Sequence, residues 1–248
     1  MAVREALAAC STGRPGLGLE GGILRDAGDA VLEGLVPEAM QTELAKVVAA
    51  APTPLVVLGG DDSVTVGVVR GVRADALLTF DAHHDCRDPM NGVTNGTPVR
   101  QLVEARDVST VVQIGIAPFS NGESNRRWAE GAGITIIETA LVHREGIDFC
   151  LDRAFVRMQE AERIAVDLDL DVLDRSYAPG APAAMPGGLH PQMVFEAMQR
   201  LGADERVVAL AITEHDPDRD LNQQTARVAA LALLHFAAGV AARRLRAD

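Results

Sequence analysis

Aromatic side chains and lysine are scarce in this sequence. Only 3% of the 248 residues are aromatic while 48% are hydrophobic, so we expect a core built from aliphatic side chains. The 23 basic residues include a single lysine, Lys46, and the formal net charge is −12. This acidic balance argues against a surface that binds nucleic acid or an anionic membrane.

Long apolar runs and paired cysteines are also missing. No stretch reaches membrane-spanning length without a polar break, and no long apolar segment follows Met1, so we expect neither a membrane helix nor a signal peptide. The cysteines, Cys10, Cys86 and Cys150, have no zinc-ligand spacing and form no even-numbered disulfide framework. A reducing compartment fits this usage, and we expect the protein in the cytoplasm.

Short β-branched runs alternate with helical segments along the chain. Strands are expected over 55–58, 76–81, 111–116, 134–137, 163–167 and 206–213, and helices over 37–51, 64–72, 98–106, 124–131, 148–162, 191–201 and 223–245. Such alternation predicts βαβ units and a parallel sheet. No internal repeat, linker or charge block interrupts it, so residues 1–248 are expected to form a single domain.

Acidic residues gather where the predicted strands end. Asp81, His83 and Asp85 follow one apolar strand, and extended backbone would point them to one side. The acids at 167, 169 and 171 follow another strand in the same pattern. Carboxylates crowded together repel one another unless a cation lies between them. Since sites in parallel sheets form at the carboxyl ends of strands, the two clusters predict one metal site.

Four motifs in order resemble the arginase–agmatinase (ureohydrolase) family. They are Gly59-Gly60-Asp61-Asp62-Ser63, Asp81-Ala82-His83-His84-Asp85, Asp169-Leu170-Asp171-Val172-Leu173-Asp174, and Glu214 before Pro217. The resemblance implies a three-layer α/β/α fold with a mostly parallel central sheet, and two Mn²⁺ ions per chain bridged by hydroxide. Members are often trimers or hexamers, although a monomer stays open.

The resemblance also implies individual roles for the matching residues. Asp81 and Asp169 would bridge the two ions, with Asp85 on the first ion and His83 and Asp171 on the second. Asp62 stands where a first-ion histidine is usual. As a catalytic group, Asp85 would also carry a proton to the leaving amine, and Glu214 would pair with the guanidinium of a small-molecule substrate. The alternative for Glu214 is a surface ion pair with Arg219.

Other positions depart from the family pattern. Asn95 replaces a usual histidine, and an asparagine cannot shuttle protons. The loop 86–94 is a few residues shorter than in arginases and opens the entrance. Asn91, which lies in this loop, is also an expected substrate-binding residue. Glu123 and Ser120 align with the arginase loop that reads the amino-acid head of the substrate, where Ser120 replaces a usual aspartate.

These departures favour a substrate other than plain arginine. We expect cleavage of Nω-hydroxy-L-arginine to hydroxyurea and ornithine, as in relatives from antibiotic biosynthesis, or of arginine to urea and ornithine. Agmatine, guanidinobutyrate and formiminoglutamate are alternatives within the family. A non-catalytic, arginase-like binding protein is the alternative of another class.

Overall fold

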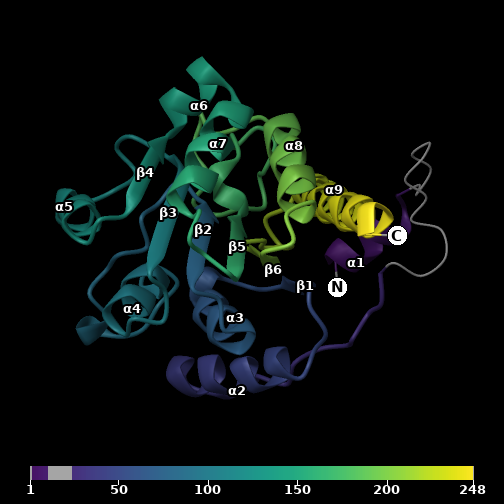
Figure 1. Cartoon of the computed structure of the whole chain (residues 1–248), viewed down its shortest axis with the longest axis horizontal. Coiled ribbons are helices and arrows are strands. Elements are labelled where there is room, and N and C mark those ends of the chain that lie inside the picture. Colours follow the sequence, from purple (N-terminus) through teal and green to yellow (C-terminus); the bar gives the residue numbers. More distant parts are fainter. Residues whose placement is uncertain (1, 11–23, 248) are drawn as a thin grey trace.

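A six-stranded sheet lies at the centre of the computed structural model, which describes residues 2–10 and 24–247 (Figure 1). Every pair of neighbouring strands is parallel, in the order β1-β6-β5-β2-β3-β4. The strands are β1 (Leu55–Leu58), β2 (Ala76–Phe80), β3 (Thr110–Ile116), β4 (Thr135–Glu138), β5 (Ile164–Asp169) and β6 (Val207–Thr213). All six correspond to strands expected from the sequence, and the parallel sheet is confirmed.

Helices cover both faces of this sheet and make the three layers (Figure 1). One face carries α2 (Pro37–Ala49), α3 (Thr65–Val72), α4 (Pro98–Glu104) and α5 (Glu123–Gly131). The other carries α1 (Ala2–Ala8), α6 (Thr139–Glu145), α7 (Ile147–Arg157), α8 (Pro191–Gly202) and α9 (Gln224–Ala247). The three-layer α/β/α prediction is confirmed.

The side chains of β2 alternate between the hydrophobic cores on the two faces of the sheet. Ala76, Leu78 and Phe80 are fully buried and belong to the core under α7, α8 and α9. Leu77, between them, belongs to the core under α2, α3 and α4. Successive side chains of a strand point to opposite faces, so a strand covered on both sides is a continuous apolar run.

The helix expected over 148–162 begins within one residue of its expected start but ends five residues early. It is α7, which ends at Arg157, and a separate helix α6 precedes it. Gly146 separates the two with a φ of +85°, a conformation that favours glycine. Beyond α7, the carboxylate of Asp75 accepts hydrogen bonds from the backbone N–H groups of Glu162 and Arg163 at 3.0 and 2.9 Å. These bonds hold the chain in the extended entry to β5 instead of a last helical turn.

The helix α9 runs along the face that also carries α8 (Figure 1). It is long and apolar enough to cross a membrane by length and composition, although no such segment was expected from the sequence. Within the fold, 72% of its apolar stretch is buried. A Cβ on Gly239 would lie 2.2 Å from the carbonyl oxygen of Gln199, so α8 and α9 approach each other at backbone distance. The apolar surface of α9 therefore serves the core.

Candidate metal centre and active site

The acidic residues singled out from the sequence meet above the carboxyl edge of the sheet. Asp81 follows β2, Asp169 ends β5, and Asp171 lies in the 3₁₀ turn Leu170–Val172. Asp62 lies in the 3₁₀ turn Asp62–Val64 after β1, and Glu214 follows β6. The strands β1, β6, β5 and β2 are consecutive in the sheet, which is why these segments converge.

A turn, and not strand alternation, brings Asp81, His83 and Asp85 together. The strand β2 ends at Phe80, so the extended backbone expected through Asp85 is wrong. The Asp81 carboxylate accepts a hydrogen bond from the His83 backbone N–H at 2.6 Å, and Asp85 has a φ of +48°. A left-handed backbone at an aspartate is uncommon and turns the chain sharply. The predicted cluster exists, but the local geometry that creates it was not predicted.

Two groups of three side chains share Asp81 and have potential ligand atoms within 4.8 Å of one another. One contains Asp81, His83 and Asp171, and the other contains Asp62, Asp81 and Asp85. His83 Nδ1 lies 2.8 Å from Asp171 Oδ2 and 3.5 Å from Asp81 Oδ1. A carboxylate common to both groups could contact two neighbouring cations at once.

Asp169 belongs to neither group, although it lies beside them. One of its oxygens accepts a hydrogen bond from the backbone N–H of Asp171 at 2.7 Å, which orients the Asp171 turn. Asp167, two residues earlier on β5, is buried and accepts a 3.4 Å hydrogen bond from the Thr213 hydroxyl.

The electrostatics of these residues fit a divalent cation site. Burial, and then neighbouring acids, raise the pKa values of Asp62, Asp81 and Asp169 well above the ordinary range. Burial raises the pKa values of Asp85 and Asp167 to about 7. Among the described residues, one buried oxygen of Asp81 and one of Asp167 lack a hydrogen-bond partner. Ionised carboxylates packed like this need bound cations to offset their repulsion. Carboxylate oxygens with one imidazole suit a hard divalent ion such as Mn²⁺.

Glu214 faces the centre from a strained backbone position with a φ of +61°. Its Oε1 accepts hydrogen bonds from the Asn95 side-chain amide at 3.0 Å and the Asp62 backbone N–H at 3.1 Å. Burial raises the pKa of Glu214, and the hydrogen bond from Asn95 opposes that shift. The surface pair between Glu214 and Arg219 is wrong, since Arg219 pairs with Asp216 at 3.1 Å. Asn95 and Glu214 are thus brought into direct contact.

The loop between β3 and α5 contributes a residue that sequence reasoning missed. The Asn121 side chain accepts a hydrogen bond from the His84 N–H at 2.8 Å and donates one to the Ala82 carbonyl at 2.9 Å. These two bonds bracket His83 on both sides. Nothing in the sequence motif marks Asn121, because its partners are backbone groups of a segment 37 and 39 residues away.

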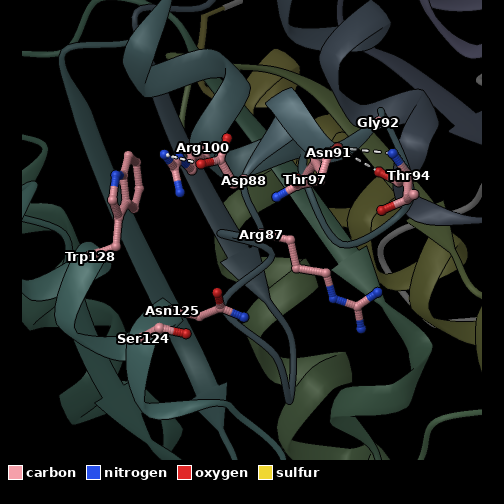
Figure 2. A pocket seen from close by; sticks show the side chains of 10 residues that line it. All are labelled: Arg87, Asp88, Asn91, Gly92, Thr94, Thr97, Arg100, Ser124, Asn125 and Trp128. Atoms are coloured by element: carbon pink, nitrogen blue, oxygen red, sulfur yellow. Dashed lines mark hydrogen bonds and ion pairs between the residues drawn. The ribbon is translucent and has the colours of Figure 1, made fainter.

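The residues expected to bind the substrate are more dispersed. Ser120 is half-buried in the same loop, whereas the Glu123 carboxylate is exposed and forms an ion pair with Arg127 at 2.6 Å. Asn91 lines a pocket of about 550 Å³ beside the loop 86–97 (Figure 2). Arg87, which the sequence analysis did not single out, lines this pocket as well.

The fold and the site define a three-layer α/β/α protein with a carboxylate-rich candidate cation site at the carboxyl edge of a parallel sheet. The chain belongs to the arginase family, whose sequence profile matches residues 1–239.

Curated relatives of the chain are named formimidoylglutamase. The one from Halalkalibacterium halodurans is 35% identical over 192 residues, covering 74% of this chain and 60% of that protein. The one from Halobacterium salinarum is 33% identical over 249 residues, covering 96% and 80%. The chain thus spans only 60% of the length of the Halalkalibacterium protein in their match.

Solved structures give the same fold. The formimidoylglutamase from Bacillus subtilis matches with a TM-score of 0.90 and 29% identity, over 97% of this chain and 79% of that one. The Trypanosoma cruzi formiminoglutamase with Mn²⁺ matches with a TM-score of 0.84 and 23% identity, over 97% and 86%.

Proposed function

We propose that this protein hydrolyses the amidine C–N bond of an N-formimidoyl amino acid, with N-formimidoyl-L-glutamate as the first candidate. The reaction adds water to the formimidoyl carbon and releases formamide and the free amino group. The observation that carries this proposal is the pair of ligand groups sharing Asp81 beside Glu214, in a chain whose relatives at 33–35% identity are named formimidoylglutamase. Formiminoglutamate was only an alternative in the sequence analysis, and no relative named here supports hydroxy-arginine or antibiotic biosynthesis.

Two Mn²⁺ ions per chain are the proposed cofactors. His83 and Asp171 would hold one ion and Asp62 and Asp85 the other, with Asp81 and Asp169 between them. Bound divalent ions lower the pKa of a water molecule and so make a nucleophile available near neutral pH. Buried, unpaired carboxylate oxygens are the property of this chain that favours such binding.

The protein's own residues orient the substrate and move the proton. An amidinium presents two N–H groups on one edge, which a carboxylate binds in a forked arrangement. Glu214 is the carboxylate proposed for this contact, and the Asn95 amide holds one of its oxygens in place. Asp85 is proposed to take the proton of the attacking water on a carboxylate oxygen and return it to the leaving nitrogen. Asn95 has no proton to give from a titrating group, so this transfer rests on Asp85.

The test is a side-by-side kcat/KM measurement with Mn²⁺-loaded protein on N-formimidoyl-L-glutamate, arginine, Nω-hydroxy-L-arginine and agmatine. We expect formamide release from the first to be fastest. Glu214→Gln should lower kcat about 10²–10³-fold while leaving metal content unchanged, because it removes the charge and retains the shape. Glu43→Gln, which breaks an exposed pair with Lys46 on α2, is the matched control and should match the parent.

Other results would assign a different function. A preference for one of the guanidino compounds would indicate that the protein hydrolyses a guanidine, as arginases and agmatinases do. If none of the four substrates is cleaved, the non-catalytic binding protein is favoured. Location in the cytoplasm and assembly as a monomer, trimer or hexamer stay predictions.

A further inference from the structure

Arg87 is an exposed cation on the loop 86–97, which also carries Asn95. It lines the pocket of about 550 Å³, and Figure 2 shows its guanidinium pointing away from Arg100 and Trp128. Arg100 is paired with Asp88 at 3.1 Å and Glu104 at 2.7 Å, and its guanidinium lies 5.2 Å from the centre of the Trp128 ring. In the described part of the chain, no carboxylate forms an ion pair with Arg87.

The fold holds the Arg87 side chain beside the residues that orient the amidine. Arg87 donates its backbone N–H to the Gly96 carbonyl at 2.8 Å. A Cβ on Gly96 would lie 2.7 Å from both Cδ and Nε of Arg87, so the arginine stem occupies the space that a side chain would need. Gly96 directly follows Asn95, whose amide contacts Glu214.

The neighbour of Gly96 is the Arg87 side chain and not a rigid backbone segment. Gly96 has no positive φ, so its conformation is open to any residue. Because Arg87 is exposed and its stem is flexible, a larger side chain at position 96 would displace the arginine.

Arg87 lies close to the residue proposed to bind the amidine. Its stem lies against Gly96, and Asn95, the residue before Gly96, places its side-chain amide 3.0 Å from Glu214 Oε1. Arg87 is thus separated from Glu214 by a single residue contact on the same loop.

An anionic substrate needs such a cation. The centre contains seven acidic side chains, which outnumber the four positive charges of two divalent ions: Asp62, Asp81, Asp85, Asp167, Asp169, Asp171 and Glu214. A substrate whose tail is neutral or cationic would enter the negative potential of this centre unaided. A substrate with two carboxylates would be repelled by it. A guanidinium offers a carboxylate two parallel hydrogen bonds.

We propose that Arg87 binds a carboxylate of the substrate's amino-acid part and so selects acidic N-formimidoyl amino acids. This inference rests on the proposed function, because it names the feature by which the same site distinguishes its substrates. Arg87 acts at the tail of the substrate, while Glu214 acts at the amidine.

The experiment compares Arg87→Met with the parent on N-formimidoyl-L-glutamate and on N-propylformamidine, which carries no carboxylate. We expect kcat/KM for the first to fall about 10- to 100-fold, mainly through KM, and that for the second to change less than about threefold. Gly96→Ala displaces the arginine without removing it and should raise KM for N-formimidoyl-L-glutamate alone. Arg100→Met is the matched control, since it removes an already neutralised arginine from the same pocket and should affect both substrates alike.

Two further arms identify the carboxylate and separate this inference from the proposed function. N-formimidoyl-L-glutamine lacks the side-chain carboxylate, and the N-formimidoyl derivative of the L-glutamate α-amide lacks the α-carboxylate. One of the two should be a poor substrate for the parent and no poorer for Arg87→Met. The carboxylate missing from that derivative is the group that Arg87 binds. Calorimetric titration of Mn²⁺-loaded protein with L-glutamate needs no turnover, and Arg87→Met should weaken that binding by the same factor. A parent that cleaves no formimidoyl compound would overturn the proposed function, and the glutamate titration would still decide the role of Arg87. Equal losses on both substrates, or unchanged glutamate binding, would overturn the role given to Arg87.

Discussion

Without bound metal, the free energy of unfolding of this protein should decrease as the pH rises from 5 to 8. The buried Asp167 has its pKa raised from 3.8 to about 7, so its folded state favours the protonated acid. A group of this kind leaves the free energy of unfolding unchanged below pH 3.8 and lowers it progressively between pH 3.8 and pH 7. About two pH units of that range lie above pH 5, which at 1.36 kcal/mol per unit is about 3 kcal/mol.

The other titrating groups decide whether this window isolates the acidic centre. Asp174 and Asp204 have lowered pKa values, so their contributions are complete before pH 5 and constant above it. The raised pKa of His83 adds stability at low pH that is lost as the pH rises, in the same direction as Asp167. The pKa of His84 is lowered by burial, which works in the opposite direction near pH 6.5. Because the acids interact, we take the contribution of one carboxylate as the size of the whole effect.

Thermal unfolding of the protein in EDTA and in excess Mn²⁺ at pH 5, 6, 7 and 8 measures this effect. For a chain of this length, about 3 kcal/mol corresponds to a drop in Tm of about 10 °C in EDTA. With Mn²⁺ the trend should reverse, since metal ligands must be deprotonated to bind. Asp167→Asn should flatten the EDTA curve. A metal-free protein whose Tm rises between pH 5 and 8 would refute the reasoning that the centre is a set of uncompensated acids.

Substitutions at three positions test individual assignments in the metal centre. Asp62→His should retain or tighten Mn²⁺ binding, which metal titration would measure; lost binding would show that the aspartate itself is needed. Asp169→Ala should release both ions, and elemental analysis that still finds two per chain would limit Asp169 to orienting its neighbouring turn. Asn121→Ala removes the two hydrogen bonds that bracket His83, so Mn²⁺ affinity should fall about 10- to 100-fold. Ser120→Ala, in the same loop, is its control and should leave Mn²⁺ affinity unchanged; equal losses in both variants would make the effect one of the loop alone.

The strand pattern was readable from the sequence because burial on both faces demands continuous apolar residues. Leu77 and Leu78 face different cores, and both are fully buried. Helix ends were less readable, since they depend on contacts distant in sequence. The chain between α7 and β5 is held by the Asp75 carboxylate, which accepts a hydrogen bond from the Glu162 N–H and lies 87 residues earlier in the sequence. No local pattern near Glu162 contains that information.

By itself, the sequence determined the parallel α/β architecture and the placement of its acids at the carboxyl ends of strands. Both follow from local periodicity, because an apolar strand that ends in Asp81 or Asp169 must deliver its carboxylate to the same edge of the sheet. Only the tertiary structure decided how the side chains meet. The left-handed turn at Asp85, the clamp of Asn121 on the backbone around His83 and the seat of Arg87 over Gly96 are contacts between separate segments. Their strength depends on distances of a few ångströms, which are set only when the loops above the sheet pack against one another.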